Sequence, residues 1–245
     1  MYYKKRGKMI AYIVLIAAMA ICQGCMYQSG TKKESDESSF TTETTSQNAV
    51  YYVGQVVTMG EFEQDDDETN GKEPMKWDVI DVKDNRALLI AHDLVEYVQY
   101  NNTKTSITWE NSSLRQWMNG AFYDATFSPD EKQKILSTRT ENRNSSNGVD
   151  GGNDTYDKVF SLSTDEARMY FSGDNQRKVR YTEHIKHYNL CGDSQYEWWW
   201  LRSPGGYAYN AALVDNQGQI VEIHGDPVDD NDIAVRPAMW IRNDT

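Results

Sequence analysis

The sequence has few cysteines and few basic residues. Only 3 of its 245 residues are cysteine, and 25 lysines and arginines face 37 aspartates and glutamates. Cys22 and Cys25 lie near the N-terminus, so Cys191 is the single cysteine of the later part and no disulfide can form within it. The excess of negative charge argues against a nucleic-acid ligand, whose phosphates require a basic surface.

Long apolar runs are also lacking. The longest, residues 9–21, is shorter than the about 20 residues that a spanning helix requires. Four positive charges in residues 2–8 precede it, and this order is typical of a secretory signal. We therefore predict that residues 1–24 form a signal peptide, with an uncleaved membrane anchor as the alternative reading.

Two cleavage sites are compatible with this segment. Small residues favour ordinary cleavage after Ala20, whereas "CQGC" resembles a bacterial lipobox that would place a lipid on Cys25. The Ser/Thr-rich residues 25–48 are predicted to be a disordered tether, because they can bury little apolar surface. Residues 49–245 would then form a single domain. We expect an exported protein, either lipid-anchored on the extracellular face of the membrane or secreted.

Periodicity in the first half of this domain predicts a strand, a hairpin and two helices. Residues 55–64 are predicted to be a strand and residues 76–95 a hairpin turning at Asp84-Asn85. Residues 111–122 place Leu114, Trp117, Met118 and Phe122 on one helical face. A second helix begins at Ser128-Pro129, where a capping serine precedes a proline and a glutamate follows at the third position.

The second half continues with one more helix and several strands. Ser163 and Glu166 repeat the capping pattern, and residues 158–162 before them are predicted to be a strand. Four later segments are rich in β-branched and aromatic residues and are also predicted to be strands. Strands and helices that alternate without a regular βαβ repeat indicate an α+β fold of short mixed or antiparallel strands with a few short helices.

Several of these segments, in this order, resemble a family of uncharacterised bacterial proteins, domain of unknown function 6273. The shared segments run from about Val53 to the end. They include "WENSSLRQWMNGAF", which contains Trp109 and Trp117, then "DKVFSLSTDEARMYF", "WWLRSPGG" and "VRPAMWI". The resemblance implies that Trp109, Trp117, Trp199, Leu201 and Arg236 belong to a structural motif.

That family in turn resembles the C-type-lectin-like superfamily, in the branch that contains formylglycine-generating enzymes. The resemblance implies a lectin-like fold. It does not imply the oxidase activity, because that chemistry uses a pair of cysteines and the domain has only Cys191. No Gly-rich phosphate loop and no G-x-S-x-G elbow is present either. We predict no catalytic residues and expect a binding domain in preference to an enzyme.

Three consecutive tryptophans, in "EWWWLRSPGGY", are the most unusual feature. On a strand, Trp199 and Leu201 share one face, while Trp198, Trp200 and Arg202 share the other. One interpretation is that the whole set is structural. The other is a ligand-binding platform of flat aromatic and polar groups that takes a glycan or cell-wall component. Its members would be Trp198, Trp200, Arg202, Tyr207 and Tyr209.

Charged residues offer two further hypotheses. Arg236 lies in an otherwise apolar strand and must be paired if buried, so we predict an ion pair with a helix carboxylate such as Glu110 or Glu166. The acidic loops at 149–157 and 225–232 have oxygen ligands suitable for calcium. The loop at 66–77 departs from an EF-hand, because Trp77 occupies the position of the final glutamate. No cofactor is expected, with calcium as the alternative.

Zinc binding by His184, His187 and Cys191 lacks a fourth ligand at a suitable spacing, so no metal site is predicted. The function predicted from the sequence is therefore a non-catalytic ligand-binding domain on the bacterial cell surface. The alternatives are an adhesion module that acts through protein contacts, and an enzyme of the formylglycine-generating type without the paired cysteines.

Overall fold

The computed structural model describes residues 51–188 and 194–243. The predicted signal peptide and the tether with Cys25 lie outside the described residues, and so does Cys191. Within the two described ranges, every helix is too short or too polar to cross a bilayer.

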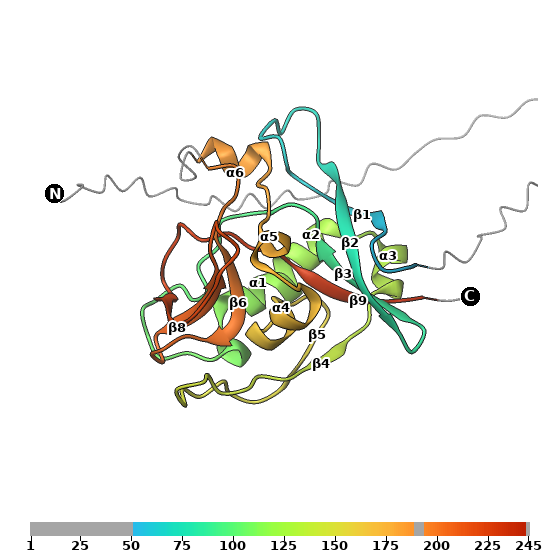
Figure 1. The fold of residues 1–245 in the computed structure, drawn as a ribbon. Helices are drawn as coiled ribbons and strands as arrows, with labels where there is room; N and C mark the ends of the chain where they lie inside the picture. The colour runs from blue at the N-terminus through green and yellow to red at the C-terminus, as the bar shows by residue number, and fades with distance from the viewer. Residues whose placement is uncertain (1–50, 189–193, 244–245) are drawn as a thin grey trace, which may run out of the picture. The chain divides into compact units, whose positions relative to one another are not determined.

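Three antiparallel sheets and a series of short helices make up the described chain, which confirms the α+β class (Figure 1). The largest sheet has the strand order β1-β2-β3-β9. Its strands are Val56–Phe62 (β1), Glu73–Lys83 (β2), Arg86–Ala91 (β3) and Ala238–Arg242 (β9). The last strand therefore completes a sheet that begins at the first one.

The hairpin of β2 and β3 forms as predicted. Asp84 and Asn85 both adopt a positive φ, 50° and 56°, which is the backbone that a two-residue turn between twisted strands requires. In β2, Met75, Trp77 and Val79 are buried while their neighbours are not, so this strand covers the core with one face.

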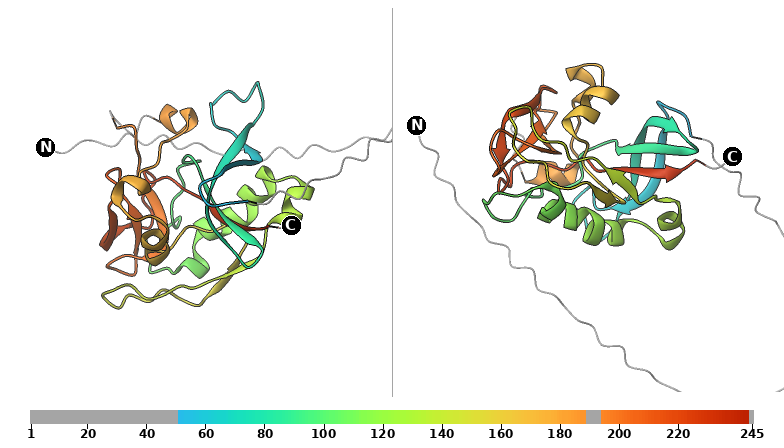
Figure 2. Two further views of the ribbon diagram at one scale, coloured as in Figure 1. Left: turned by 45° about the vertical axis from the view of Figure 1, so that its right-hand side comes forward. Right: turned by 90° about the horizontal axis from the view of Figure 1, so that it is seen from below.

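A continuous helical segment follows, preceded by the 3-10 turn η1 (Trp109–Asn111). It consists of α1 (Ser113–Trp117), the π-helical turn η2 (Met118–Phe122) and α2 (Tyr123–Thr126). Leu114, Met118 and Phe122 are buried as predicted. η1 contacts β6 and α2 contacts β1, so η1 and the helical segment together extend from the sheet that contains β6 to the sheet that contains β1 (Figure 2).

Both predicted capping boxes are present. They open α3 (Pro129–Lys134) and α4 (Thr164–Tyr170), where the serine at the cap and the glutamate three residues later hold each other's backbone N–H groups. Two short helices that the sequence did not predict follow, α5 (Asp174–Arg177) and α6 (Glu183–His187).

The remaining strands form two small sheets. One pairs β4 (Thr138–Thr140) with β5 (Thr155–Asp157), and the other has the order β6-β7-β8. The strands of the latter are Trp199–Pro204 (β6), Asn210–Val214 (β7) and Ile220–Pro227 (β8).

The predicted strand over residues 158–162 is wrong. Only Phe160 bridges to Ala238, because the chain next turns to cap α4 with Ser163.

Candidate functional site

Glu166 is fixed at the start of α4 by the capping box. Its carboxylate accepts a hydrogen bond from the backbone N–H of Ser163 at 2.9 Å, and its own N–H donates to Ser163 Oγ at 3.1 Å. The side chain therefore points back across the first turn of the helix, toward the end of β6. This local sequence pattern gives the carboxylate a single direction.

Arg202, on β6, meets this carboxylate and is 2% exposed. Both terminal nitrogens of its guanidinium bind the two oxygens of Glu166. The other N–H groups donate to the carbonyls of Glu141 and Ser161, at 3.0–3.3 Å. All five N–H donors are then used, so Arg202 holds three segments together and has no donor left for a ligand.

Glu166 is the one acid of this region whose ionisation is clearly set by its neighbours. Burial opposes the charged form, but the Arg202 guanidinium and the hydrogen bonds from Ser163 outweigh it. Together they hold the pKa of the Glu166 carboxyl below its ordinary value. At neutral pH the Glu166 carboxylate is therefore ionised, and its ion pair with Arg202 is formed.

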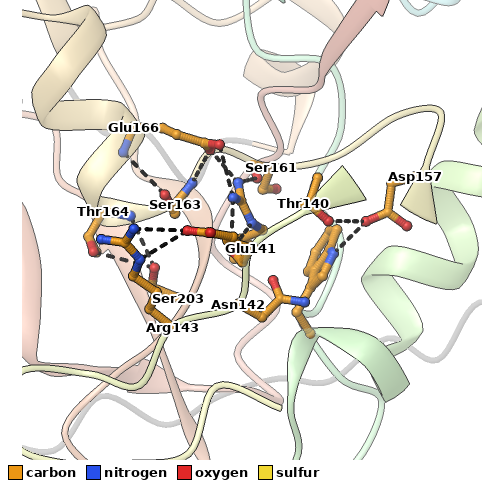
Figure 3. A network of polar contacts seen from close by, with 12 residues as sticks. Thr140, Glu141, Asn142, Arg143, Asp157, Ser161, Ser163, Thr164, Glu166 and Ser203 are labelled. Carbon is orange, nitrogen blue, oxygen red and sulfur yellow. Dashed lines mark hydrogen bonds and ion pairs between the residues drawn. The ribbon is translucent and has the colours of Figure 1, made fainter. Parts of the chain in front are cut away.

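A pocket of about 470 Å³ lies over this pair. Its walls are the loop 143–146, residues 163–169 at the start of α4, residues 202–204 of β6, and the side chains of Glu141 and Glu222. Figure 3 shows Glu141, Arg143, Ser163, Thr164, Glu166 and Ser203 converging on this region. Hydroxyl, amide and paired charged groups dominate the lining.

Two arginines stand at the rim of the pocket, each beside acids. Arg143 is ion-paired with Glu141 at 2.9 Å and with Asp165 at 3.4 Å, and Arg168 is paired with Glu222 at 2.7 Å. These pairs are exposed enough for water to screen them, so each contributes little to stability and can rearrange around a ligand. Three arginines and four acids line the pocket, so its charge is nearly balanced.

Ser203 is the pocket's most nucleophile-like side chain, yet nothing in the described lining activates it. Its Oγ accepts hydrogen bonds from the N–H and the hydroxyl of Thr164, at 3.0 and 3.3 Å. Neither histidine nor cysteine belongs to the lining among the described residues. Glu166, on α4, is ionised and engaged by Arg202. Ser203 therefore has no general base among the contacts described for it.

The three consecutive tryptophans lie mostly in the core. Trp199 and Trp200 are fully buried, and their indole N–H groups donate to the carbonyls of Arg177 and Val98. Leu201 is buried as well, and Trp198 is half-buried. Both faces of β6 are covered, because Trp199 contacts Arg177 of α5 and the Arg236 guanidinium, whereas Trp200 packs against Tyr100. Trp200 therefore offers no surface to a ligand in this structure.

Tyr207 and Tyr209 have the opposite placement. They are exposed on the turn between β6 and β7, with Tyr207 at 54%, and their rings stack in parallel with centroids 5.4 Å apart. Lys104 lies over the Tyr209 ring at 5.6 Å. The side chain of Asn147 donates to the Gly206 carbonyl at 3.3 Å, which joins this turn to the loop that forms one wall of the pocket.

Arg236 is buried and ion-paired, but with a different partner from those predicted. It bonds Asp78 of β2 at 3.4 Å and the Ala91 carbonyl at 2.9 Å, between the rings of Phe171 and Trp199. Burial lowers the pKa of the Arg236 guanidinium to about 10, against the pull of nearby Asp78 and Asp93. The predicted pairing with Glu110 or Glu166 is wrong, because Arg202 occupies Glu166 and Glu110 accepts from Asn153.

Trp109 and Trp117 both pack against the core. Trp109 is buried and its indole N–H donates to Asp157 at 3.0 Å. Asp157 also accepts from Thr140, Thr155 and Arg115, at 2.6–2.9 Å, and is fully buried. Trp117 is half-buried, with its ring 5.0 Å from that of Phe122.

Acidic side chains that could attract a cation gather in the loop between β1 and β2. The carboxylates of Glu63, Asp65 and Glu73 lie within 4.8 Å of one another. Each accepts a hydrogen bond from the loop itself: Glu63 from two backbone N–H groups, Asp65 from the Asn70 amide and Glu73 from the N–H of Gln64. These hydrogen bonds within the loop therefore engage all three carboxylates.

The sequence reasoning found Arg202 but missed most of the pocket. The loop 143–146 lines the pocket because of where the chain folds, and no motif in its sequence indicates this. Arg168 and Glu222 form an ion pair between two elements that lie far apart in sequence. The capping box at Ser163 was a usable signal, because it fixes where Glu166 points.

Comparison with known proteins identifies the family. The family model described as "Domain of unknown function (DUF6273)" matches residues 84–243, which begins after Val53 but includes every residue that lines the pocket. No curated protein and no solved structure matches the chain. With well over half of its length matched by the model, the chain belongs to the DUF6273 family.

Proposed function

We propose that this protein is an exported, lipid-anchored bacterial surface protein whose domain binds a neutral glycan of the cell wall or cell surface without catalysis. The observation that supports this most strongly is the pocket over the Arg202–Glu166 pair. Its lining offers hydroxyl, amide and paired charged groups, which present donors and acceptors side by side as sugar hydroxyls require. The C-type-lectin-like fold suggested by the sequence belongs to the same proposal.

Charge narrows the ligand class. The pocket's three arginines are offset by four acids, so a strongly anionic ligand would gain little there. A neutral sugar can exchange hydrogen bonds with the rim pairs of Arg143 and Arg168 without leaving a charge unpaired. The stacked Tyr207 ring on the adjoining turn adds a flat apolar surface of the kind that covers a sugar face.

Two substitutions test the glycan proposal. In the full chain, Arg168→Ala and Tyr207→Ala are each expected to weaken binding of a neutral cell-wall oligosaccharide at least about tenfold, because each removes a direct contact with the sugar. Calorimetric titration of a panel of neutral oligosaccharides and peptidoglycan fragments, with and without calcium, would measure this. Binding that is lost only when a chelator removes calcium would point to the calcium alternative.

Tyr156→Ala is the matched control, because Tyr156 is also an exposed tyrosine but lies on β5 outside the pocket. It should bind as the parent does. The proposal is wrong if the parent binds no member of the panel, or if Arg168→Ala and Tyr207→Ala bind as tightly as the parent.

One observation favours the adhesion alternative. The turn with Tyr207 and Tyr209 pairs with β8, where Ile223 is 66% exposed, so exposed apolar side chains gather outside the pocket. A protein partner would then be held by this surface. Ile223→Asp would abolish such adhesion while leaving sugar binding intact, which separates the two functions.

A further inference from the structure

His184, on α6, lies between two carboxylates. Its side chain is about 10% exposed. Nδ1 faces Asp66 Oδ1 at 3.2 Å, and Nε2 faces Glu96 Oε2 at 3.0 Å. Asp66 belongs to the loop between β1 and β2, and Glu96 to the segment after β3, so a single imidazole joins three separate parts of the chain.

The protonation state follows from this geometry. A neutral imidazole carries one N–H, so it can donate to only one of the two carboxylates. The imidazolium carries two and satisfies both. The three-way contact is therefore complete only when His184 is positively charged.

The surrounding charges favour that state. The second histidine of α6, His187, places Nδ1 2.9 Å from Asp66 Oδ2, so the two imidazoles share one carboxylate. Asp65, Glu183 and Lys186 lie nearby, and Lys186 is paired with Glu183 at 2.9 Å. The ring of Tyr188 contacts His184 edge-on at 5.5 Å. Among the described side chains named around the imidazole, acids outnumber bases.

The loop meets α6 at Asp66, which has a φ of +66° and whose N–H donates to Glu63 Oε1 at 2.7 Å. The backbone adds one tether to the same helix, from the His184 N–H to the Gln64 carbonyl at 2.9 Å. Without the contacts between the imidazoles and the carboxylates, this backbone hydrogen bond would be the remaining described link between the loop and α6.

We propose that His184 is a pH-sensitive latch that fastens the β1–β2 loop and Glu96 to α6 when protonated and releases the loop when neutral. The proposal is independent of the glycan pocket. It is carried by the contact of one imidazole with two carboxylates from separate segments.

The direction of the pH dependence follows. The hydrogen bond to Glu96 and the charges of Glu96 and Asp66 raise the pKa of His184 above its ordinary value, although burial opposes the shift. A raised pKa in the folded state means that the contact stabilises fully below the ordinary histidine pKa and is lost as the pH rises through the raised one. The latch is closed in acid and opens toward alkaline pH.

Amide hydrogen exchange of the full chain tests the latch. Between about pH 5.5 and about pH 8.5, protection of residues 63–73 is expected to fall about tenfold or more after correction for intrinsic exchange. In His184→Gln the protection should be low at both pH values and its pH dependence much smaller than in the parent, because only the more exposed His187–Asp66 pair remains. His224→Gln is the control, because His224 is exposed on β8, and it should behave as the parent does.

Two further measurements keep the result decisive. Asp66→Asn retains the side-chain size but removes the shared carboxylate, so it should abolish the pH dependence even if His184→Gln proves unstable. A nuclear magnetic resonance titration of His184 should show a pKa above the ordinary histidine value. Unchanged loop protection across the range in the parent, or a His184 pKa at or below the ordinary histidine value, would overturn the proposal.

Discussion

Replacing Glu166 with alanine should lower the free energy of unfolding by about 3–5 kcal/mol, because Arg202 would be left buried without its counter-charge. The capping box that opens α4 would be lost at the same time. Urea unfolding of the parent and Glu166→Ala, compared at neutral pH, measures the difference.

Asp165→Asn is the matched control for this change. Asp165 is the adjacent acid, but it is exposed and its pair with Arg143 is long, at 3.4 Å. Its replacement should change stability by less than about 1 kcal/mol. Equal effects of the two substitutions would contradict the central role that we assign to the Arg202–Glu166 pair.

The same pair predicts a loss of stability in acid. Burial raises the pKa of Glu166, but Arg202 and Ser163 outweigh burial and lower it overall. A lowered pKa in the folded state contributes stability that is present above the ordinary carboxyl pKa and is lost as the pH falls through the lowered one. The parent should therefore lose more stability than Glu166→Ala over this acidic range. The difference between their free energies of unfolding should become smaller as the pH falls.

The second large effect is expected at Asp157, which is fully buried and accepts from Trp109, Thr140, Thr155 and Arg115. Asp157→Asn keeps the size of the side chain but removes its charge and one acceptor oxygen. At least one buried donor then faces an N–H group. We expect a loss of about 2–4 kcal/mol in the free energy of unfolding, measured by urea unfolding.

Asp154→Asn is the control, because Asp154 lies on the same stretch of chain but pairs with Arg139 at the surface. A small change is expected there. The networks of Asp157 and Glu166 meet at neighbouring residues, since the Thr140 side chain bonds Asp157 and the Glu141 carbonyl bonds Arg202 (Figure 3). The double variant Glu166→Ala/Asp157→Asn should therefore deviate from additivity.

Local sequence patterns accounted for much of the fold. The turn at Asp84-Asn85 and the two capping boxes each involve residues within four positions of one another, so their geometry can be derived without the rest of the chain. The strands after residue 197 also follow from local composition, because these segments are rich in β-branched and aromatic residues. The π-helical turn at Met118–Phe122 kept the predicted buried face while the helix extended beyond residue 122.

The pairing of charges could not be derived in this way. Arg236 was expected to need a partner, but its partner Asp78 lies 158 residues away in sequence. Arg202, a candidate for the ligand platform, instead pairs with Glu166, 36 residues away. Which acid meets which arginine depends on how the sheets and helices pack. Of the two interpretations of the tryptophans, the structural one describes Trp199 and Trp200, since packing buries both side chains completely.

The strand order β1-β2-β3-β9 has a consequence for synthesis of the protein. β3 pairs with β9 so that Leu89 lies opposite Met239, a separation of 150 residues. While the ribosome is still translating the residues between them, the edge of β3 has no partner, and such an edge is a template for aggregation. Contacts this distant in sequence also slow folding. We expect the nascent chain to need chaperone protection until the codons for β9 have been read.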